Sequence, residues 1–271
     1  MIELLNCDCM EYMKGCDDRS IDLIVTSPPY ANQRKNCYKG KDADHYIEWF
    51  LRFAFEFKRI LKPTGSFFLN IKPHCHNGER TLYVMKLIIA LKEVVGFRFT
   101  DEFCWTKLGV PGRFYGRFKN AFEPVYHFTV QKGFTHNPYN VATEAKDISK
   151  ARYKRKACGE TKNGSKFAGM RSEIESNLAL PSNHIHLVQK SNQHTLQSKH
   201  PAIYPVELCE FFIKAFSNQG DVVFDPFLGS GTTGVASIKT DRNFVGCELD
   251  RKYFKLAQER LDNQNKQQTM F

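Results

Sequence analysis

The chain has 271 residues, of which 42% are hydrophobic and 25% are charged, as is typical of a soluble globular protein. No apolar run approaches the roughly 20 residues of a membrane helix, and no secretory signal is visible, so we expect a cytoplasmic protein and not an integral membrane protein. Lysine plus arginine outnumber aspartate plus glutamate by 39 to 29, and the resulting formal charge of +10 is explained equally well by a polyanionic partner and by solubility alone.

Alternating strands and helices are predicted along most of the chain. In the first half, strands are predicted at 1–6, 21–26, 66–71, 97–107 and 122–130, and helices at 43–61 and 80–95. A polar, basic and weakly periodic stretch from 133 to about 199 follows and indicates an inserted module. Beyond it we expect helices at 204–217, 232–239 and 250–261, strands at 221–225 and 243–248, and a frayed tail at 262–271. This alternation predicts an α/β fold with a doubly wound, mostly parallel sheet.

The nine cysteines are most simply free thiols, because the chain has no export signal. Two short groupings, Cys7-x-Cys9 and His74-Cys75-His76, lack a second ligand pair at the spacing of structural zinc sites. We therefore expect no metal.

A glycine-rich loop at residues 225–234 follows one predicted strand and opens the next predicted helix. Gly229 and Gly231 permit a tight turn and a close approach of the backbone to a ligand. The loop is neither a P-loop nor the dinucleotide fingerprint, because no lysine follows the glycines and the third glycine is misplaced. The next strand ends at Glu248, whose carboxylate can accept hydrogen bonds from both ribose hydroxyls of a nucleoside. Together the two features predict a cofactor that carries a nucleoside.

A second loop, Ser27-Pro28-Pro29-Tyr30, directly follows the predicted strand at 21–26. Its two prolines stiffen the backbone and leave a segment rich in acceptors, namely the Ser27 hydroxyl and the carbonyls of residues 27–29. Two such acceptors can draw the hydrogens of a base amine out of the ring plane and localise the nitrogen lone pair. Tyr30 can stack on the base. A proline-rich turn with a packed tyrosine is an equally good explanation of these residues taken alone.

Together the two loops resemble those of the DNA amino-methyltransferases, which methylate cytosine N4 or adenine N6 with S-adenosylmethionine. Ser27-Pro28-Pro29-Tyr30 resembles the catalytic tetrad of that family, and the segments 199–205 and 246–250 resemble those beside its methionine and ribose sites. Phe122-Glu123-Pro124 and Pro63-x-Gly65 match weaker signatures. The resemblance implies S-adenosylmethionine as cofactor, bound by Asp8, His200, Pro201, Asp225, Phe227, Gly229, Ser230, Gly231, Thr232 and Glu248.

The order of the motifs resembles that of the circularly permuted beta subgroup. It implies a catalytic half at 1–131, a target recognition insert at 132–198 and a cofactor-binding half at 199–271. Serine in the first tetrad position, with His-Pro-Ala at 200–202, resembles the enzymes specific for cytosine N4. Adenine N6 is the near alternative. Methylation of cytosine C5 is disfavoured, because it needs a cysteine nucleophile, usually in a Pro-Cys pair that this chain lacks.

The insert carries the most basic part of the chain, and beside a base-modifying site these cations suit phosphate and guanine contacts in double-stranded DNA. We expect DNA contacts from Lys150, Arg152, Lys154, Arg155, Lys156, Lys166 and Arg171. The family resemblance also implies a restriction-modification system with a cognate endonuclease as functional partner, and a monomer or homodimer. A non-catalytic nucleic-acid-binding module and a methyltransferase for RNA or protein amides remain as other classes.

Overall fold

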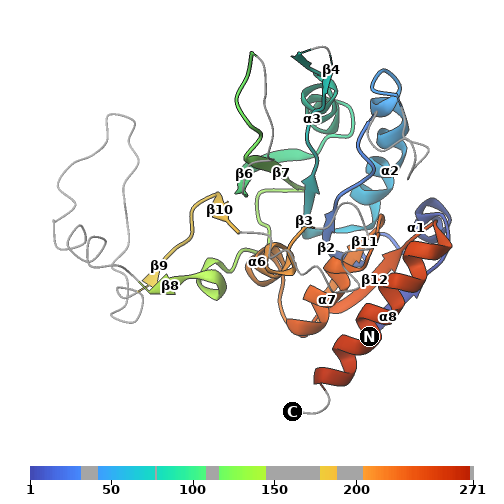
Figure 1. The fold of residues 1–271 in the computed structure, drawn as a ribbon. Coiled ribbons are helices and arrows are strands. Elements are labelled where there is room, and N and C mark those ends of the chain that lie inside the picture. The colour runs from blue at the N-terminus through green and yellow to red at the C-terminus, as the bar shows by residue number, and fades with distance from the viewer. Residues whose placement is uncertain (32–41, 77, 108–115, 145–177, 188–203, 269–271) are drawn as a thin grey trace.

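The computed structural model describes residues 1–31, 42–76, 78–107, 116–144, 178–187 and 204–268 (Figure 1). Its centre is an eight-stranded sheet with the order β1-β12-β11-β2-β3-β7-β6-β10. The strands are β1 Ile2–Leu5, β2 Ile21–Thr26, β3 Leu61–Asn70, β6 Arg98–Thr106, β7 Phe122–Thr129, β10 His184–His186, β11 Val222–Asp225 and β12 Asn243–Cys247. Neighbouring strands are parallel except where β7 pairs with β3 and with β6. The mostly parallel α/β sheet predicted from the sequence is confirmed.

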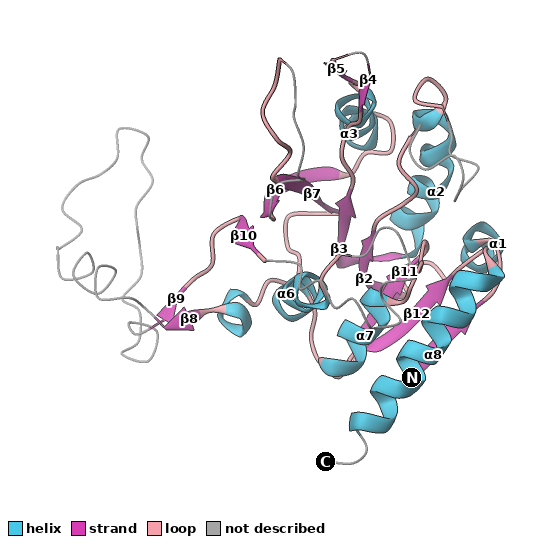
Figure 2. Ribbon diagram, viewed as in Figure 1, coloured by secondary structure: helices cyan, strands magenta, loops and turns pink. Residues whose placement is uncertain are grey.

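Helices cover both faces of this sheet (Figure 2). The core on one face is built with α1 Cys9–Gly15, α2 Tyr46–Ile60 and α3 Tyr83–Glu93. The core on the other face is built with α6 Val206–Phe216, α7 Thr232–Lys239 and α8 Arg251–Gln268. Successive strand residues point to opposite faces, so Phe67 and Leu69 join the first core while Phe68 joins the second. No helix of the described residues is long and apolar enough to span a membrane.

Most predicted elements are confirmed within a few residues, and the differences have identifiable causes. The tail at 262–271, which was predicted to fray, is helical as far as Gln268, the last described residue, whose side chain donates to Asp241 Oδ1 at 3.2 Å. The prediction from sequence missed the short helix α1, which Asp8 caps by accepting from the Met10 N–H at 2.9 Å. It also began the third strand at residue 66, whereas β3 already begins at Leu61. Gly65 is needed there, since a Cβ would lie 2.9 Å from the Asp22 carbonyl oxygen of β2.

Parts of the predicted insert pack against the main domain. The strand β10 extends the central sheet by pairing with β6. The 3-10 helix η1 Pro138–Val141 lies against α6, and the Asn137 N–H donates to the Ala215 carbonyl at 2.7 Å. Smaller pairs are β4 Cys75–His76 with β5 Glu79–Arg80, and β8 Thr143–Glu144 with β9 Leu178–Ala179. The division of the chain at 132 and 198 stays a prediction.

Candidate active site

The two loops singled out from the sequence leave neighbouring strands at the same edge of the sheet. The parallel strands β2 and β11 pair directly, and their carboxyl ends carry the Ser-Pro-Pro-Tyr loop and the glycine-rich loop. Thr26, the last residue of β2, donates a 2.7 Å hydrogen bond to Asp225 Oδ1 at the end of β11. Both side chains are buried, at 1% and 0% exposure. A buried hydrogen bond therefore joins the starting points of the two loops.

Asp225 organises the glycine-rich loop from beneath. Its Oδ2 accepts from the Thr233 hydroxyl at 2.7 Å and the Tyr204 hydroxyl at 3.4 Å, while Oδ1 accepts from the Phe227 N–H at 3.1 Å. Burial raises the pKa of this carboxyl, and the surrounding donors work against that rise. The sequence-based prediction placed Asp225 among the residues that bind the cofactor. The structure shows its oxygens directed into the protein, where they hold the loop.

The glycine at 231 is required by α8. The backbone is left-handed at Gly229, with φ 54°, and at Gly231, with φ 80°. A Cβ at Gly231 would lie 2.7 Å from Leu261 Cδ1 and 3.0 Å from Ala257 Cβ. The prediction from sequence gave a different reason, namely that a side chain at 231 would fill the space for a ligand. The close approach seen in the structure is between this backbone and helix α8.

The hydroxyl groups of the loop also point toward α8. The buried Arg260 guanidinium donates to the Ser230 carbonyl, to Ser230 Oγ at 2.9 Å and to Thr232 Oγ1 at 3.3 Å. Burial lowers the pKa of Arg260. Ser230 and Thr232 are 4% and 3% exposed. These side chains therefore anchor the backbone of the loop, and their role in cofactor binding stays a prediction.

Glu248 gives this edge a carboxylate suited to a nucleoside. It follows β12, and its two oxygens accept from the Gly229 N–H at 2.8 Å and the Asp250 N–H at 2.9 Å. Burial raises the pKa of Glu248 to about 7. Asp8 follows the neighbouring strand β1, and Phe227 packs on α2 with its ring 5.3 Å from that of Phe53. A half-buried carboxylate that holds a glycine turn fits a ribose that donates two hydroxyl hydrogens.

The Ser-Pro-Pro-Tyr loop is fixed by buried tyrosine and asparagine side chains. The Tyr46 hydroxyl donates to the Pro29 carbonyl at 2.8 Å, so one of the acceptors expected from the sequence is already engaged. The Ser27 hydroxyl lies 3.3 Å from Tyr30 Oη and 3.4 Å from Asn70 Oδ1. Tyr30 Oη donates to Asn70 Oδ1 at 3.1 Å. Because the one Ser27 hydrogen is directed into this network, the oxygen lone pairs of Ser27 are left to accept a hydrogen from a substrate.

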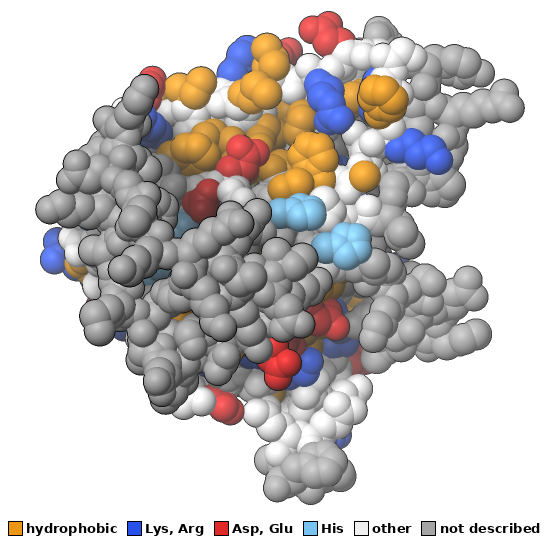
Figure 3. Space-filling model, turned by 90° about the vertical axis from the view of Figure 1, so that its left-hand side faces the viewer, with side chains coloured by type: hydrophobic (Ala, Val, Ile, Leu, Met, Phe, Trp, Pro, Cys, Tyr) orange, Lys and Arg blue, Asp and Glu red, His pale blue; other side chains and the backbone are white. Residues whose placement is uncertain are grey.

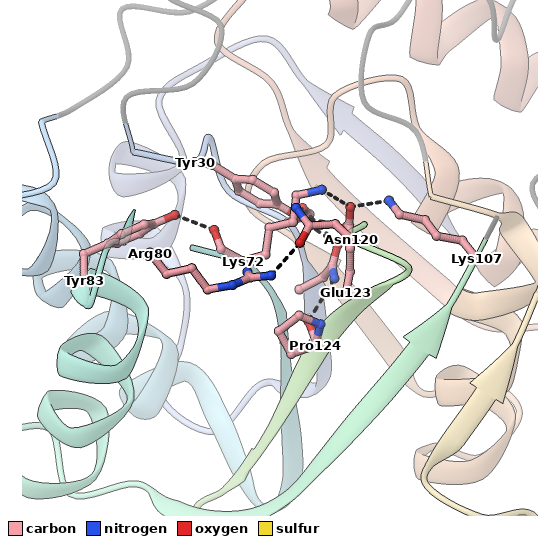
Figure 4. A network of polar contacts seen from close by, with 10 residues as sticks. Tyr30, Lys72, Arg80, Tyr83, Lys107, Asn120, Glu123 and Pro124 are labelled. Atoms are coloured by element: carbon pink, nitrogen blue, oxygen red, sulfur yellow. Dashed lines mark hydrogen bonds and ion pairs between the residues drawn. The ribbon is translucent and has the colours of Figure 1, made fainter. Parts of the chain in front are cut away.

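A charged cluster adjoins this network (Figure 4). Glu123 of β7 is 6% exposed, and its Oε1 accepts from the ammonium groups of both Lys72 and Lys107. Its Oε2 lies 3.5 Å from Tyr30 Oη. Burial raises the pKa of Glu123, but the two ammonium charges outweigh that effect and hold the pKa below its usual value. Burial in turn lowers the pKa of Lys107.

Several predicted site residues lie outside the described part of the chain. These are His200, Pro201 and the cations expected to bind DNA, Lys150, Arg152, Lys154, Arg155, Lys156, Lys166 and Arg171. On the face drawn in Figure 3, described lysine and arginine side chains border a hydrophobic area in the upper half of the molecule. The residues that the structure describes contain no group of three histidine, cysteine or acidic side chains that could hold a metal ion.

The structure adds residues to the site that were not predicted from the sequence. Asn70 and Lys72 lie at and just after the end of β3, Lys107 follows β6, and Glu123 is near the start of β7. The Phe-Glu-Pro signature at 122–124 was the one available signal for Glu123. Asn70 accepts from Tyr30, and its amide donates to the Pro124 carbonyl at 3.0 Å, contacts that join residues 40 and 54 positions apart.

Comparisons with known proteins agree with this geometry. A family model described as DNA methylase, for the N6 and N4 methyltransferases, matches residues 21–259. This chain belongs to the DNA methylase family. It is 33% identical over 255 residues to the orphan methyltransferase M.BamHII of Bacillus amyloliquefaciens, with 91% of this chain and 90% of that protein covered. It is 29% identical to the type II methyltransferase M.PvuII of Proteus hauseri, with 94% and 82% covered.

Other relatives and solved structures extend this likeness. The chain is 26% identical to the DNA adenine methyltransferase YhdJ of Escherichia coli, with 96% of this chain and 82% of that protein covered. The fold matches the cytosine-N4-specific PvuII DNA methyltransferase with a TM-score of 0.72, 23% identity and coverage of 98% and 91%. It also matches a DNA modification methylase of Thermus thermophilus, solved in complex with S-adenosylmethionine, with a TM-score of 0.66, 20% identity and coverage of 97% and 94%.

The protein is thus a DNA methyltransferase of the family that includes the N4 and N6 enzymes, and its cofactor is S-adenosylmethionine. The residues present fit that cofactor, because Glu248, the glycine turn and Phe227 provide a carboxylate for a ribose, an ordered backbone and an apolar wall.

Proposed function

We propose that this DNA methyltransferase transfers the methyl group to the exocyclic N4 amine of cytosine in duplex DNA. The observation that carries the proposal is the orientation of Ser27. Its hydroxyl hydrogen is engaged by Asn70 and Tyr30, which leaves an acceptor at the end of β2, one strand away from the cofactor loop. A neutral acceptor at this point suits an amine whose two hydrogens must be held while its lone pair attacks.

In this reaction the protein positions the base and provides the polar groups that hold its amine. S-adenosylmethionine supplies a methyl group on a sulfonium, which is electrophilic enough to react without a covalent enzyme intermediate. Ser27 Oγ accepts one amine hydrogen, and the Pro28 carbonyl accepts the other. Tyr30 stacks on the base, with its hydroxyl fixed by Asn70. The N–CH3 bond forms as the S–CH3 bond breaks, and the amine proton is shed to water during or after transfer. Since Ser27 is a poor base, it aligns the amine rather than removing this proton, and catalysis comes chiefly from orientation.

The target base must leave the duplex to reach this loop, because its amine is otherwise paired and stacked. The cost of flipping is about a few kcal/mol, and the basic residues of 146–171 offset it by binding phosphates. Cations in that range outnumber acidic residues, which supports DNA contact there. The names of the type II relatives support a place in a restriction-modification system beside a cognate endonuclease.

Methylation of adenine N6 is the second candidate, because a relative of similar coverage is named a DNA adenine methyltransferase. The same acceptors would hold an adenine amine. Mass spectrometry of nucleosides from the DNA of cells that express the protein distinguishes the two. We expect N4-methylcytosine with wild type and a smaller amount of it with Ser27→Ala. N6-methyladenine instead would keep the reaction class and contradict the proposed base.

A further inference from the structure

Two lysines share one carboxylate beside the catalytic loop. Lys72 and Lys107 both donate to Glu123 Oε1, so three charged groups from the ends of β3, β6 and β7 meet with a net charge of +1 (Figure 4). The lysine side chains keep 26% and 17% of their surface exposed, whereas Glu123 keeps 8%. The carboxylate is therefore the buried member, and the cations lie on its solvent side.

This cluster is continuous with the groups that hold the substrate amine. Glu123 Oε2 lies 3.5 Å from Tyr30 Oη, which lies 3.3 Å from Ser27 Oγ. A base stacked on Tyr30 with its amine at Ser27 would consequently present its next ring atoms toward the cluster. The Lys107 ammonium is also held over the Trp105 ring, 4.8 Å from the ring centroid, which restricts its position.

Stability alone gives little reason for such a cluster. Removing three charges from water is costly, and apolar side chains of similar size are often as stabilising as a buried ion pair. Each ammonium has three N–H bonds and uses one on Glu123. Within the described part of the chain, neither Lys72 nor Lys107 donates its other two N–H bonds to a protein acceptor. The cluster thus presents several cationic donors next to the amine site.

Cytosine and adenine differ in the acceptor atoms that they offer to these donors. Next to its amine, cytosine has two acceptors on the same edge, the ring nitrogen N3 and the carbonyl O2. Adenine has the acceptor N1 and then an apolar C2–H. We propose that Lys72 and Lys107, oriented by Glu123, donate to the ring-edge acceptors of the target base and so select cytosine. This inference rests on the proposed function, since it names the groups that read the base in that same site.

The test uses duplexes that contain the modified sequence, located first in the genome of expressing cells. One duplex carries cytosine at the target position. A second carries an aminopyridine C-nucleoside that keeps the amine and the adjacent ring nitrogen but lacks the carbonyl. The full-length variants Lys72→Met, Lys107→Met and Lys107→Arg are compared with wild type. Lys92→Met, at an exposed lysine in the last turn of α3, is the matched control. Binding of S-adenosylmethionine and thermal unfolding report whether each variant is folded.

We expect at least one methionine variant to lower kcat/KM on cytosine by about ten- to a hundredfold, the range of one lost base contact, and to change kcat/KM on the analogue less than twofold. Lys107→Arg should recover part of the loss, and Lys92→Met should match wild type. Equal losses of kcat/KM on both duplexes would mean that the lysines contact phosphates or support the structure, and would overturn the inference. If wild type methylates only adenine, the proposed function itself fails, which is a separate outcome.

Discussion

Thr26 and Asp225, 199 positions apart in the chain, form a 2.7 Å hydrogen bond between two almost fully buried side chains. Thr26 immediately precedes the Ser-Pro-Pro-Tyr loop, and Asp225 begins the glycine-rich loop. The contact therefore fixes the catalytic loop relative to the cofactor loop, and a methyl transfer that depends on alignment depends on that relationship.

Thr26→Val should remove the donor while it keeps the shape of the side chain. The Asp225 carboxylate would lose one of its donors in a buried site, which should cost about 1–3 kcal/mol of unfolding free energy. Urea unfolding measures that loss, and we expect weaker cofactor binding by calorimetry as well. Thr100→Val, at a 2.9 Å contact with Thr129 on β6 and β7, is the control and should leave cofactor affinity unchanged. Equal cofactor affinity in wild type and Thr26→Val would argue against this coupling.

Gly231→Ala should destabilise the fold through both backbone conformation and contact with α8. The φ of 80° disfavours a side chain, and its Cβ would lie 2.7 Å from Leu261 Cδ1. Gly220→Ala is a matched control, because its φ is 81° but nothing lies within 4 Å of the added Cβ. We expect about 1 kcal/mol from the conformation alone, and a further 1–3 kcal/mol at Gly231 from the contact. Equal losses of unfolding free energy in the two variants would show that α8 moves away from the added Cβ without loss of stability.

Affinity for S-adenosylmethionine should rise with pH up to about 7 and then level off. The pKa of Glu248 is raised to about 7, and ribose hydroxyls donate to the ionised carboxylate. Protonation therefore competes with binding, and affinity falls by up to about tenfold for each pH unit below 7. Titration calorimetry between pH 5.5 and 8.5 measures this. Glu248→Gln should bind more weakly and lose the pH dependence, whereas the same pH profile in both proteins would exclude this carboxylate as its source.

Ser27→Ala should lower turnover by about tenfold to a thousandfold, as expected when one oriented polar contact is lost. Cofactor affinity should not change, because Ser27 contacts Tyr30 and Asn70 rather than the glycine-rich loop. Tyr30→Phe should be milder than Tyr30→Ala, since the ring can still stack on the base. Single-turnover methylation assays measure these rates, and wild-type turnover in Ser27→Ala would rule out its catalytic role.

DNA affinity should fall steeply with salt if the basic residues of the insert bind phosphates. With about four phosphates contacted, the slope of log K against log salt would be about −3 to −4. Neutralising Lys154, Arg155 and Lys156 should flatten it, whereas neutralising the exposed Lys92 of α3 should not. Fluorescence anisotropy over a range of salt concentrations gives the slope. A slope unaffected by the triple change would place the DNA surface elsewhere.

The elements and motifs that are contiguous in the chain could be predicted from the sequence alone. The alternation of strands and helices predicted the sheet, and the two loops after 21–26 and 221–225 identified the edge that carries the chemistry. Such features depend on local periodicity and on backbone restrictions of proline and glycine, which are written in neighbouring residues. Where local signals were weak, prediction was wrong, as in the polar end of α8.

The distant side chains that complete the site could not be predicted from the sequence and are seen only in the folded protein. Asn70 and Glu123 reach Tyr30 across 40 and 93 positions, and Arg260 reaches Ser230 across 30. No local pattern marks such contacts, because strand order and helix packing bring these residues together. The same holds for Gly231, whose backbone lies close to α8, and for Asp225, whose buried oxygens accept hydrogen bonds from Thr26, Thr233 and Tyr204.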